Sequence, residues 1–114
     1  MQIDIQSRGF SLTDALFGYA QRRLLFALSY CSGHVKRVVI RLSDINGPRG
    51  GSDKRCHIQV VLAGIPDVVV EDTEANLYDA IDRAIDRVRR TVNRKVDRQF
   101  TISRQAVPLA IDAE

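Results

Sequence analysis

Arginines recur at helical spacing in the last third of the chain, where they could bind a row of phosphate groups. Spacings of three and four residues place them within roughly 80° of one another on one side of a helix. The set consists of Arg83, Arg87, Arg90, Arg94 and Arg98. Guanidinium groups bind phosphate oxygens bidentately, and a row of them displaces counterions from a nucleic acid. A solvated helix face is the alternative, because Asp79 and Asp86 each precede an arginine by four residues and can pair with it.

Cysteine and histidine occur in two short groups whose placement does not favour a metal site. Cys31 lies three residues before His34, and Cys56 directly precedes His57. Adjacent strand residues point to opposite faces of a sheet, so Cys56 and His57 cannot readily bind one zinc ion. Nothing places a nucleophile or a group of carboxylates beside Tyr30 or the histidines. We therefore expect no metal, no cofactor, no small-molecule substrate and no enzymatic activity.

The composition is that of one globular domain. A chain of 114 residues with 45% hydrophobic residues can build one core without a disulfide. No stretch of eighteen apolar residues occurs, and the first residues lack the basic start and apolar run of a secretory signal. We expect a cytoplasmic protein with no membrane partner. The net charge of +3 permits a polyanionic partner.

The hydrophobic pattern predicts the elements that position the arginines. Alternating apolar residues indicate strands, and apolar residues three or four apart indicate helices. The order is a strand over 2–6, a helix over 12–30, strands over 35–46, 56–62 and 67–71, and a helix over 75–99. We expect an α+β two-layer sandwich of order β-α-β-β-β-α, with both helices on one face of a four-stranded sheet and the other face in solvent.

Local signals refine these boundaries. We expect Ser11 to cap the first helix and Gly33 to end it in a left-handed conformation. Residues 46–53 are glycine-rich and join two predicted strands, as a long hairpin connection would. They do not match a phosphate-binding loop, because no lysine and helix start follow them in the required order. The predicted domain covers residues 1–99, and residues 100–114 form a short flexible tail.

The last predicted helix resembles the signature of the ribosome hibernation-promoting factors, also called ribosome-associated inhibitors (sigma-54 modulation protein / S30EA-like). The core of that signature is D-x-Y-x-A-I-D-x-x-I-D-[KR]-[LV]-x-R. The matching residues are Leu77, Tyr78, Asp79-Ala80-Ile81-Asp82, Ile85-Asp86-Arg87 and Arg90. The start Ile3-Asp4-Ile5, the stretch 12–16 and the order of elements are also similar. The resemblance covers about residues 1 to 99. With its short tail, the chain resembles the short forms of this family.

The resemblance implies a domain similar to double-stranded RNA-binding domains that binds the small ribosomal subunit. Such a protein occupies the mRNA channel and the A and P tRNA sites and inhibits translation in stationary phase or stress, with 16S-type rRNA as its partner. The residues on the last helix that fall where the family is basic are Arg83, Arg87, Arg90, Arg94, Lys95 and Arg98. A second group of basic candidates consists of Arg22, Arg23, Lys36, Arg37 and Arg41.

The sequence departs from the family pattern at the end of the first helix. Residues 24–28 are apolar nearly all round, where the family is usually charged. Together with Phe17, they suggest a buried second surface. The alternative function is therefore a protein interaction module of the same fold that forms a homodimer through this helix and no longer acts on ribosomes. Residues 100–114 contain one basic residue, Arg104, so we expect no strong RNA contact there.

Overall fold

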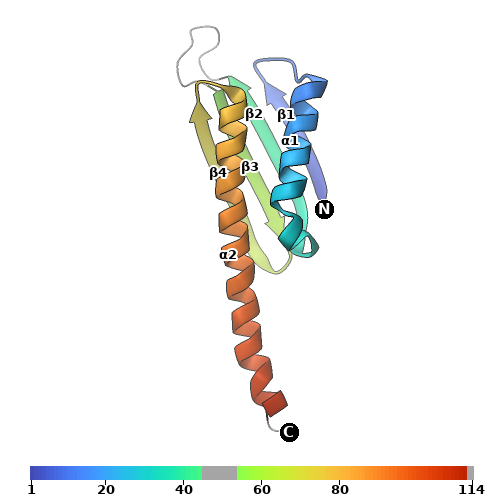
Figure 1. Ribbon diagram of the computed structural model, residues 1–114, viewed down its shortest axis with the longest axis vertical. Coiled ribbons are helices and arrows are strands. Elements are labelled where there is room, and N and C mark those ends of the chain that lie inside the picture. Colours follow the sequence, from blue (N-terminus) through green and yellow to red (C-terminus); the bar gives the residue numbers. More distant parts are fainter. Residues whose placement is uncertain (45–53, 113–114) are drawn as a thin grey trace.

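Two helices cover one face of a four-stranded sheet in the computed structural model, which describes residues 1–44 and 54–112 and the side chains up to residue 99 (Figure 1). The elements are β1 (Gln2–Arg8), α1 (Asp14–Ala27), the 3-10 helix η1 (Ser29–His34), β2 (Val35–Asp44), β3 (Lys54–Leu62), β4 (Ile65–Glu74) and α2 (Leu77–Asp112). This arrangement confirms the predicted α+β sandwich and its order of elements. The predicted hairpin connection over 46–53 lies outside the described residues.

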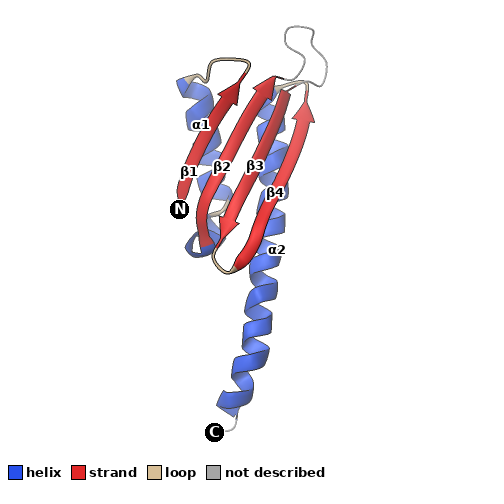
Figure 2. Cartoon of the chain, turned by 180° about the vertical axis from the view of Figure 1, so that it is seen from behind, coloured by secondary structure: helices blue, strands red, loops and turns tan. Residues whose placement is uncertain are grey.

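The sheet has the strand order β1-β2-β3-β4. β1 runs parallel to β2, and the other neighbours are antiparallel. One row of paired residues crosses all four strands, from Ile5 through Ile40 and Ile58 to Val70. This row faces the helices, and Figure 2 shows the opposite face uncovered. The sheet therefore has one apolar face for the core and one face for solvent.

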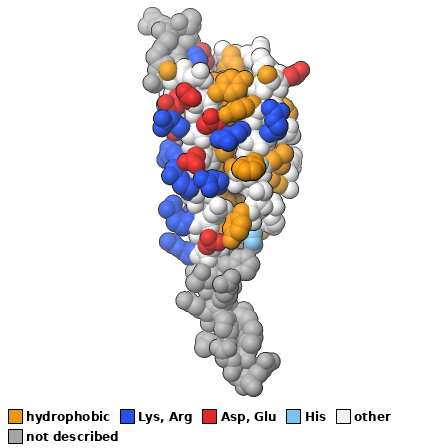
Figure 3. All heavy atoms as spheres, viewed as in Figure 1, with side chains coloured by type: hydrophobic (Ala, Val, Ile, Leu, Met, Phe, Trp, Pro, Cys, Tyr) orange, Lys and Arg blue, Asp and Glu red, His pale blue; other side chains and the backbone are white. Residues whose placement is uncertain are grey.

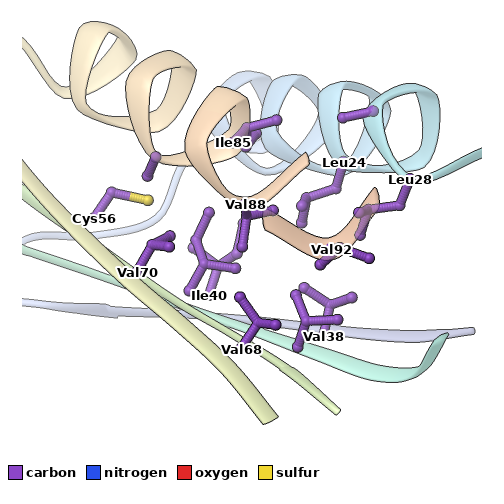
Figure 4. Close-up of a cluster of buried hydrophobic side chains, with 14 of the residues drawn as sticks. Leu24, Leu28, Val38, Ile40, Cys56, Val68, Val70, Ile85, Val88 and Val92 are labelled. Atoms are coloured by element: carbon purple, nitrogen blue, oxygen red, sulfur yellow. The ribbon is translucent and has the colours of Figure 1, made fainter. Parts of the chain in front are cut away.

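The core lies between the helices and that apolar face. Ile81, Ile85, Val88 and Val92 of α2 are at most 2% exposed, as their helical spacing predicts. Leu24 of α1 packs into the same cluster (Figure 4). Burying each such side chain stabilises the fold by roughly 1.5–3 kcal/mol, so the apolar stripe of α2 fixes which side of that helix faces solvent.

The bounds of α1 differ from the prediction at both ends. Thr13, rather than Ser11, caps the helix, because its hydroxyl oxygen accepts the Leu16 N–H at 3.1 Å. The α-helix ends at Ala27 and is followed by η1. Gly33 has no positive φ, so the predicted left-handed cap is wrong. The tighter 3-10 turn brings Cys31 into the core and leads directly into β2.

The helix α2 is longer than predicted. Asn76 precedes it and accepts the Tyr78 N–H at 2.8 Å, and the backbone stays helical to Asp112. The expected helix end at residue 99 is therefore wrong. Beyond that point α2 extends past the sheet (Figure 1), so it needs no apolar stripe, and the periodicity that defined the prediction is missing there. The division into a domain over 1–99 and a tail stays a prediction.

Candidate nucleic-acid interface

The predicted arginine ridge lies on the solvent side of α2. Its members, Arg83, Arg87, Arg90, Arg94 and Arg98, are all exposed. Figure 3 shows Lys and Arg side chains gathered along the side of α2 away from α1. The apolar stripe of α2 points to the core, so packing holds the ridge outward. Lys95, predicted with this group, is half-buried and lies off the ridge.

The ridge is purely basic only in its middle section. Arg87, Arg90 and Arg94 line a shallow hollow of about 320 Å³ together with Thr91, and no carboxylate of the described residues contributes to its wall. A second hollow nearer the start of α2 is lined by Asp79, Asp82, Arg83 and Asp86. We call Arg87, Arg90 and Arg94 the central arginines, because they present three adjacent cations to solvent.

Arg83 has a different partner from the one predicted. Its Nε lies 3.5 Å from the Glu74 carboxylate at the end of β4, in place of the expected pair with Asp79. The hydrogen bond that Glu74 shares with Asp72 raises the pKa of Glu74, while Arg83 opposes that shift. Glu74 is thus shared between two neighbours. The protein itself thus partly neutralises the charge at the start of the ridge.

Asp86 pairs with two adjacent arginines of α2. Its carboxylate lies 2.9 Å from Arg89 and 3.3 Å from Arg90, which confirms the predicted pair with Arg90. The hydrogen bond from Arg89 lowers the pKa of Asp86, and the charge of Arg90 adds to this shift. The Arg90 side chain is 63% exposed. Salt and solvent screen such a pair, so Arg90 can exchange Asp86 for a phosphate.

Arg87 lies beside the edge strand of the sheet. Its Nη1 donates a hydrogen bond to the backbone carbonyl of Glu71 on β4 at 2.9 Å. One end of the guanidinium group is therefore held, while the side chain as a whole stays exposed. A guanidinium group carries five N–H donors, so further donors remain for a phosphate.

The two basic candidates on α1, Arg22 and Arg23, have different surroundings. Arg23 donates to Asp82 of α2 at 3.2 Å, and Asp82 also accepts the Tyr19 hydroxyl at 2.5 Å. This hydrogen bond from Tyr19 to Asp82 raises the pKa of Tyr19. Arg23 therefore helps to join the two helices. Arg22 is exposed, and its guanidinium lies over Gly18.

The candidates on β2 are separated from the ridge. Arg37 and Arg41 are on the open sheet face, opposite the helices, and Arg37 pairs with Asp4 at 2.6 Å. Lys36 is exposed where the pairing of β2 with β3 is irregular. The structure thus places the predicted basic residues on two faces of the molecule. Arg8 and Arg55 lie near Arg41, and strand alternation combined with the register would have been the signal for them.

Two aromatic residues, Tyr19 and Tyr78, lie at the edge of the core. The rings of Tyr19 and Tyr78 meet edge-on, with centroids 4.8 Å apart. Tyr19 is half-buried, whereas Tyr78 is 41% exposed and does not belong to the core. Both rings close the seam between α1 and α2.

The thiols belong to the core. Cys31 is buried with its Sγ 3.0 Å from the Asn93 side-chain oxygen, and burial raises its pKa. Burial also raises the pKa of Cys56 to about 12.

Among the described residues, no three or more His, Cys, Asp or Glu side chains are grouped so that they could hold a metal ion. None of the described helices is long and apolar enough to cross a membrane.

Comparison with known proteins links this fold to the ribosome. Residues 3–99 match the family described as "Sigma 54 modulation protein / S30EA ribosomal protein". The N-terminal domain of Protein Y from Thermus thermophilus is 33% identical, with a TM-score of 0.69 over 82% of this chain and 98% of that chain. A ribosomal subunit interface protein from Coxiella burnetii is 15% identical and shares the fold, with a TM-score of 0.69 over 82% of this chain and 96% of that chain. The search of curated proteins gives no match.

Proposed function

Because the chain belongs to the sigma 54 modulation protein / S30EA ribosomal protein family, we propose that it is a ribosome hibernation factor. In this proposal it binds the small ribosomal subunit in the cytoplasm, at the mRNA channel and the A and P tRNA sites. It thereby inhibits translation in stationary phase or stress. Membership of the family supports an association with ribosomes. The binding site on the subunit and the physiological trigger are proposed in addition.

The observation that carries this proposal is the group of central arginines on α2. Arg87, Arg90 and Arg94 are exposed and share one hollow, in whose wall the described part of the chain places no carboxylate. Along the helix they span about 10 Å at 1.5 Å per residue. Three guanidinium groups over this length suit a run of backbone phosphates, which neutral or acidic partners would not offer.

The mechanism is occupancy of a site rather than chemistry. Phosphate contacts position a protein on RNA without reading its sequence, and the shape of the RNA then decides where the protein fits. The domain is held rigid by its core, so the ridge is presented without folding on binding. Arg83, Lys95 and Arg98 extend the proposed contact along α2, and Arg22, Arg23, Lys36, Arg37 and Arg41 are its secondary candidates.

Sedimentation of stationary-phase extracts tests this proposal. At low salt the protein should migrate with small subunits and monosomes, and raising the salt to about 200 mM should release it, because phosphate contacts weaken steeply over that range. Recovery only at the top of the low-salt gradient would show that the chain is not a ribosome-binding factor.

A second candidate function is self-association through α1. Phe26 is 79% exposed, Leu25 46% and Phe17 39%, and Figure 3 shows hydrophobic side chains over this helix. Nearby Tyr30 is 75% exposed. An apolar surface of this kind is typical of a protein contact. In this alternative the chain is an interaction module that forms a homodimer and does not act on ribosomes.

A further inference from the structure

A second basic hollow lies on the open face of the sheet, on the other side of the molecule from α1 and α2. It has a volume of about 460 Å³ and receives residues from all four strands. We call it the sheet hollow, and its polar residues include Arg8, Arg41, Ser43, Arg55, His57 and Glu71. The face that carries it is the one seen in Figure 2.

The strand register explains why the hollow forms there. Ser43 of β2 is paired with Arg8 of β1 on one side and with Arg55 of β3 on the other. A short side chain between two long ones leaves a depression in the sheet surface. Arg41 lies two residues before Ser43 on β2 and is paired with His57 of β3. Side chains two residues apart on a strand point to the same face, so Arg41 shares the face of Ser43. Three arginines from three adjacent strands therefore surround Ser43.

Among the residues that the structure describes, the charges in the sheet hollow are only partly balanced. Glu71 is the single carboxylate among the described residues of its lining, 3.9 Å from the Nε of Arg55. That Nε is buried and has no hydrogen-bond partner. Among the described residues, no ion pair involves Arg8 or Arg41. Arg37 on the same face contrasts with them, since its ion pair with Asp4 measures 2.6 Å.

We propose that the sheet hollow binds a phosphodiester group of RNA. Guanidinium groups from three adjacent strands line the hollow, and such groups match the bidentate geometry of phosphate oxygens. The Ser43 hydroxyl and the His57 ring add donors at the floor and wall. The hollow is open to solvent and lined mostly by polar residues, which suits one group of a large ligand better than an enclosed small molecule.

The position of the hollow relative to α2 points to RNA rather than to a free anion. Glu71 lies on the edge strand between the two basic surfaces. Its backbone carbonyl accepts from Arg87, and its side chain lies near Arg55. The two surfaces therefore meet around β4, and the domain can lie between two RNA segments. This inference rests on the proposed function, and it adds a second phosphate contact on the opposite face.

Binding to purified small subunits between about 50 and 200 mM KCl tests the inference. Arg8→Gln and Arg41→Gln remove exposed cations from the hollow, so both variants should fold. Each should weaken binding several-fold and reduce the slope of log affinity against log salt by about 1. Arg89→Gln is the matched control, because it removes one exposed cation that lies toward α1. Its affinity and slope should equal those of the unmodified protein.

Each alternative outcome has a distinct meaning. If both hollow variants bind like Arg89→Gln, the inference is wrong while the proposed function stands. If the unmodified protein does not bind subunits, the proposed function itself has failed, and the inference fails with it. Titration with inorganic phosphate, followed by NMR of the His57 and Ser43 amides, distinguishes a site for RNA phosphodiesters from a site for free phosphate ions. Saturable shifts combined with unchanged subunit binding by the variants would identify a free-anion site and overturn the assignment to RNA.

Discussion

Arg87 of α2 donates a hydrogen bond to the backbone carbonyl of Glu71 on β4 at 2.9 Å. The Glu71 side chain in turn lies 3.9 Å from Arg55 on the open sheet face. One residue of the edge strand thus contacts cations from both layers. Replacing Arg87 would disturb a contact within the fold as well as a candidate RNA contact, so Arg90 is the cleaner probe of binding.

Arg90→Glu should weaken binding to small subunits by an order of magnitude or more, whereas Arg89→Glu should change it little. Both arginines pair with Asp86 and both are exposed, so the two substitutions change the same charge and break the same kind of ion pair. They differ in direction, because Arg90 points into the ridge and Arg89 toward α1. Co-sedimentation at low salt measures the difference. Equal losses would mean that net charge, rather than the ridge, decides binding.

Thr13→Ala should destabilise the protein by about 1 kcal/mol, within the range of roughly 0.5–2 kcal/mol for a lost N-cap. The reason is that the Thr13 hydroxyl accepts the Leu16 N–H at the start of α1. Ser11→Ala is the control, since Ser11 lies outside the helix and is exposed. Urea denaturation of both variants gives the free energies of unfolding. A larger effect at Ser11 would contradict the observed cap.

Stability should fall with rising pH in the alkaline range because of Cys56. Burial raises the pKa of this thiol from 9.0 to about 12, so the folded state keeps a proton that the unfolded chain releases. The corresponding stabilisation is complete below pH 9 and is lost as the pH approaches 12. Its contribution to the slope is at most about 1.4 kcal/mol per pH unit.

Cys56→Val isolates this contribution, because it fills a similar volume without a titrating group. Thermal melts between pH 8 and 11 should show a shallower decline for Cys56→Val than for the unmodified protein. Tyrosine and lysine titrations affect both proteins alike. Parallel declines would show that the thiol ionises equally in the folded and unfolded chains.

Phe26→Ser should lower any self-association measured by light scattering over a wide concentration range. Phe26 is 79% exposed on α1, so its removal should leave the core intact. Val69→Ser is the control, since Val69 is 55% exposed but belongs to β4. A protein that stays monomeric at every concentration would rule out the homodimer.

The strands and the buried face of α2 could be predicted because their signals are local. Ile58, Val60 and Leu62 alternate in sequence, and the structure buries all three. The choice of helix cap could not be predicted, since Ser11 and Thr13 both carry a suitable hydroxyl. The helix begins at Asp14, which places Thr13 rather than Ser11 at the cap.

Rules based on sequence spacing could not predict ion pairs or neighbouring side chains that come from distant parts of the chain. A rule for residues four apart paired Arg83 with Asp79, but the end of β4 brings Glu74 closer. The sheet hollow depends on the register of four strands. Arg8 and Arg55 are far apart in sequence and meet only because each is paired with Ser43.

The hydrogen bond between Arg87 and Glu71 also bears on how the free protein avoids aggregation. β4 is an outer strand, and outer strands present unpaired backbone groups with which a strand of another molecule can pair. Arg87 occupies the Glu71 carbonyl and lays a charged side chain against this edge. A fifth strand would have to displace that guanidinium group. The arginine proposed to bind RNA thus also protects the β4 edge of the sheet.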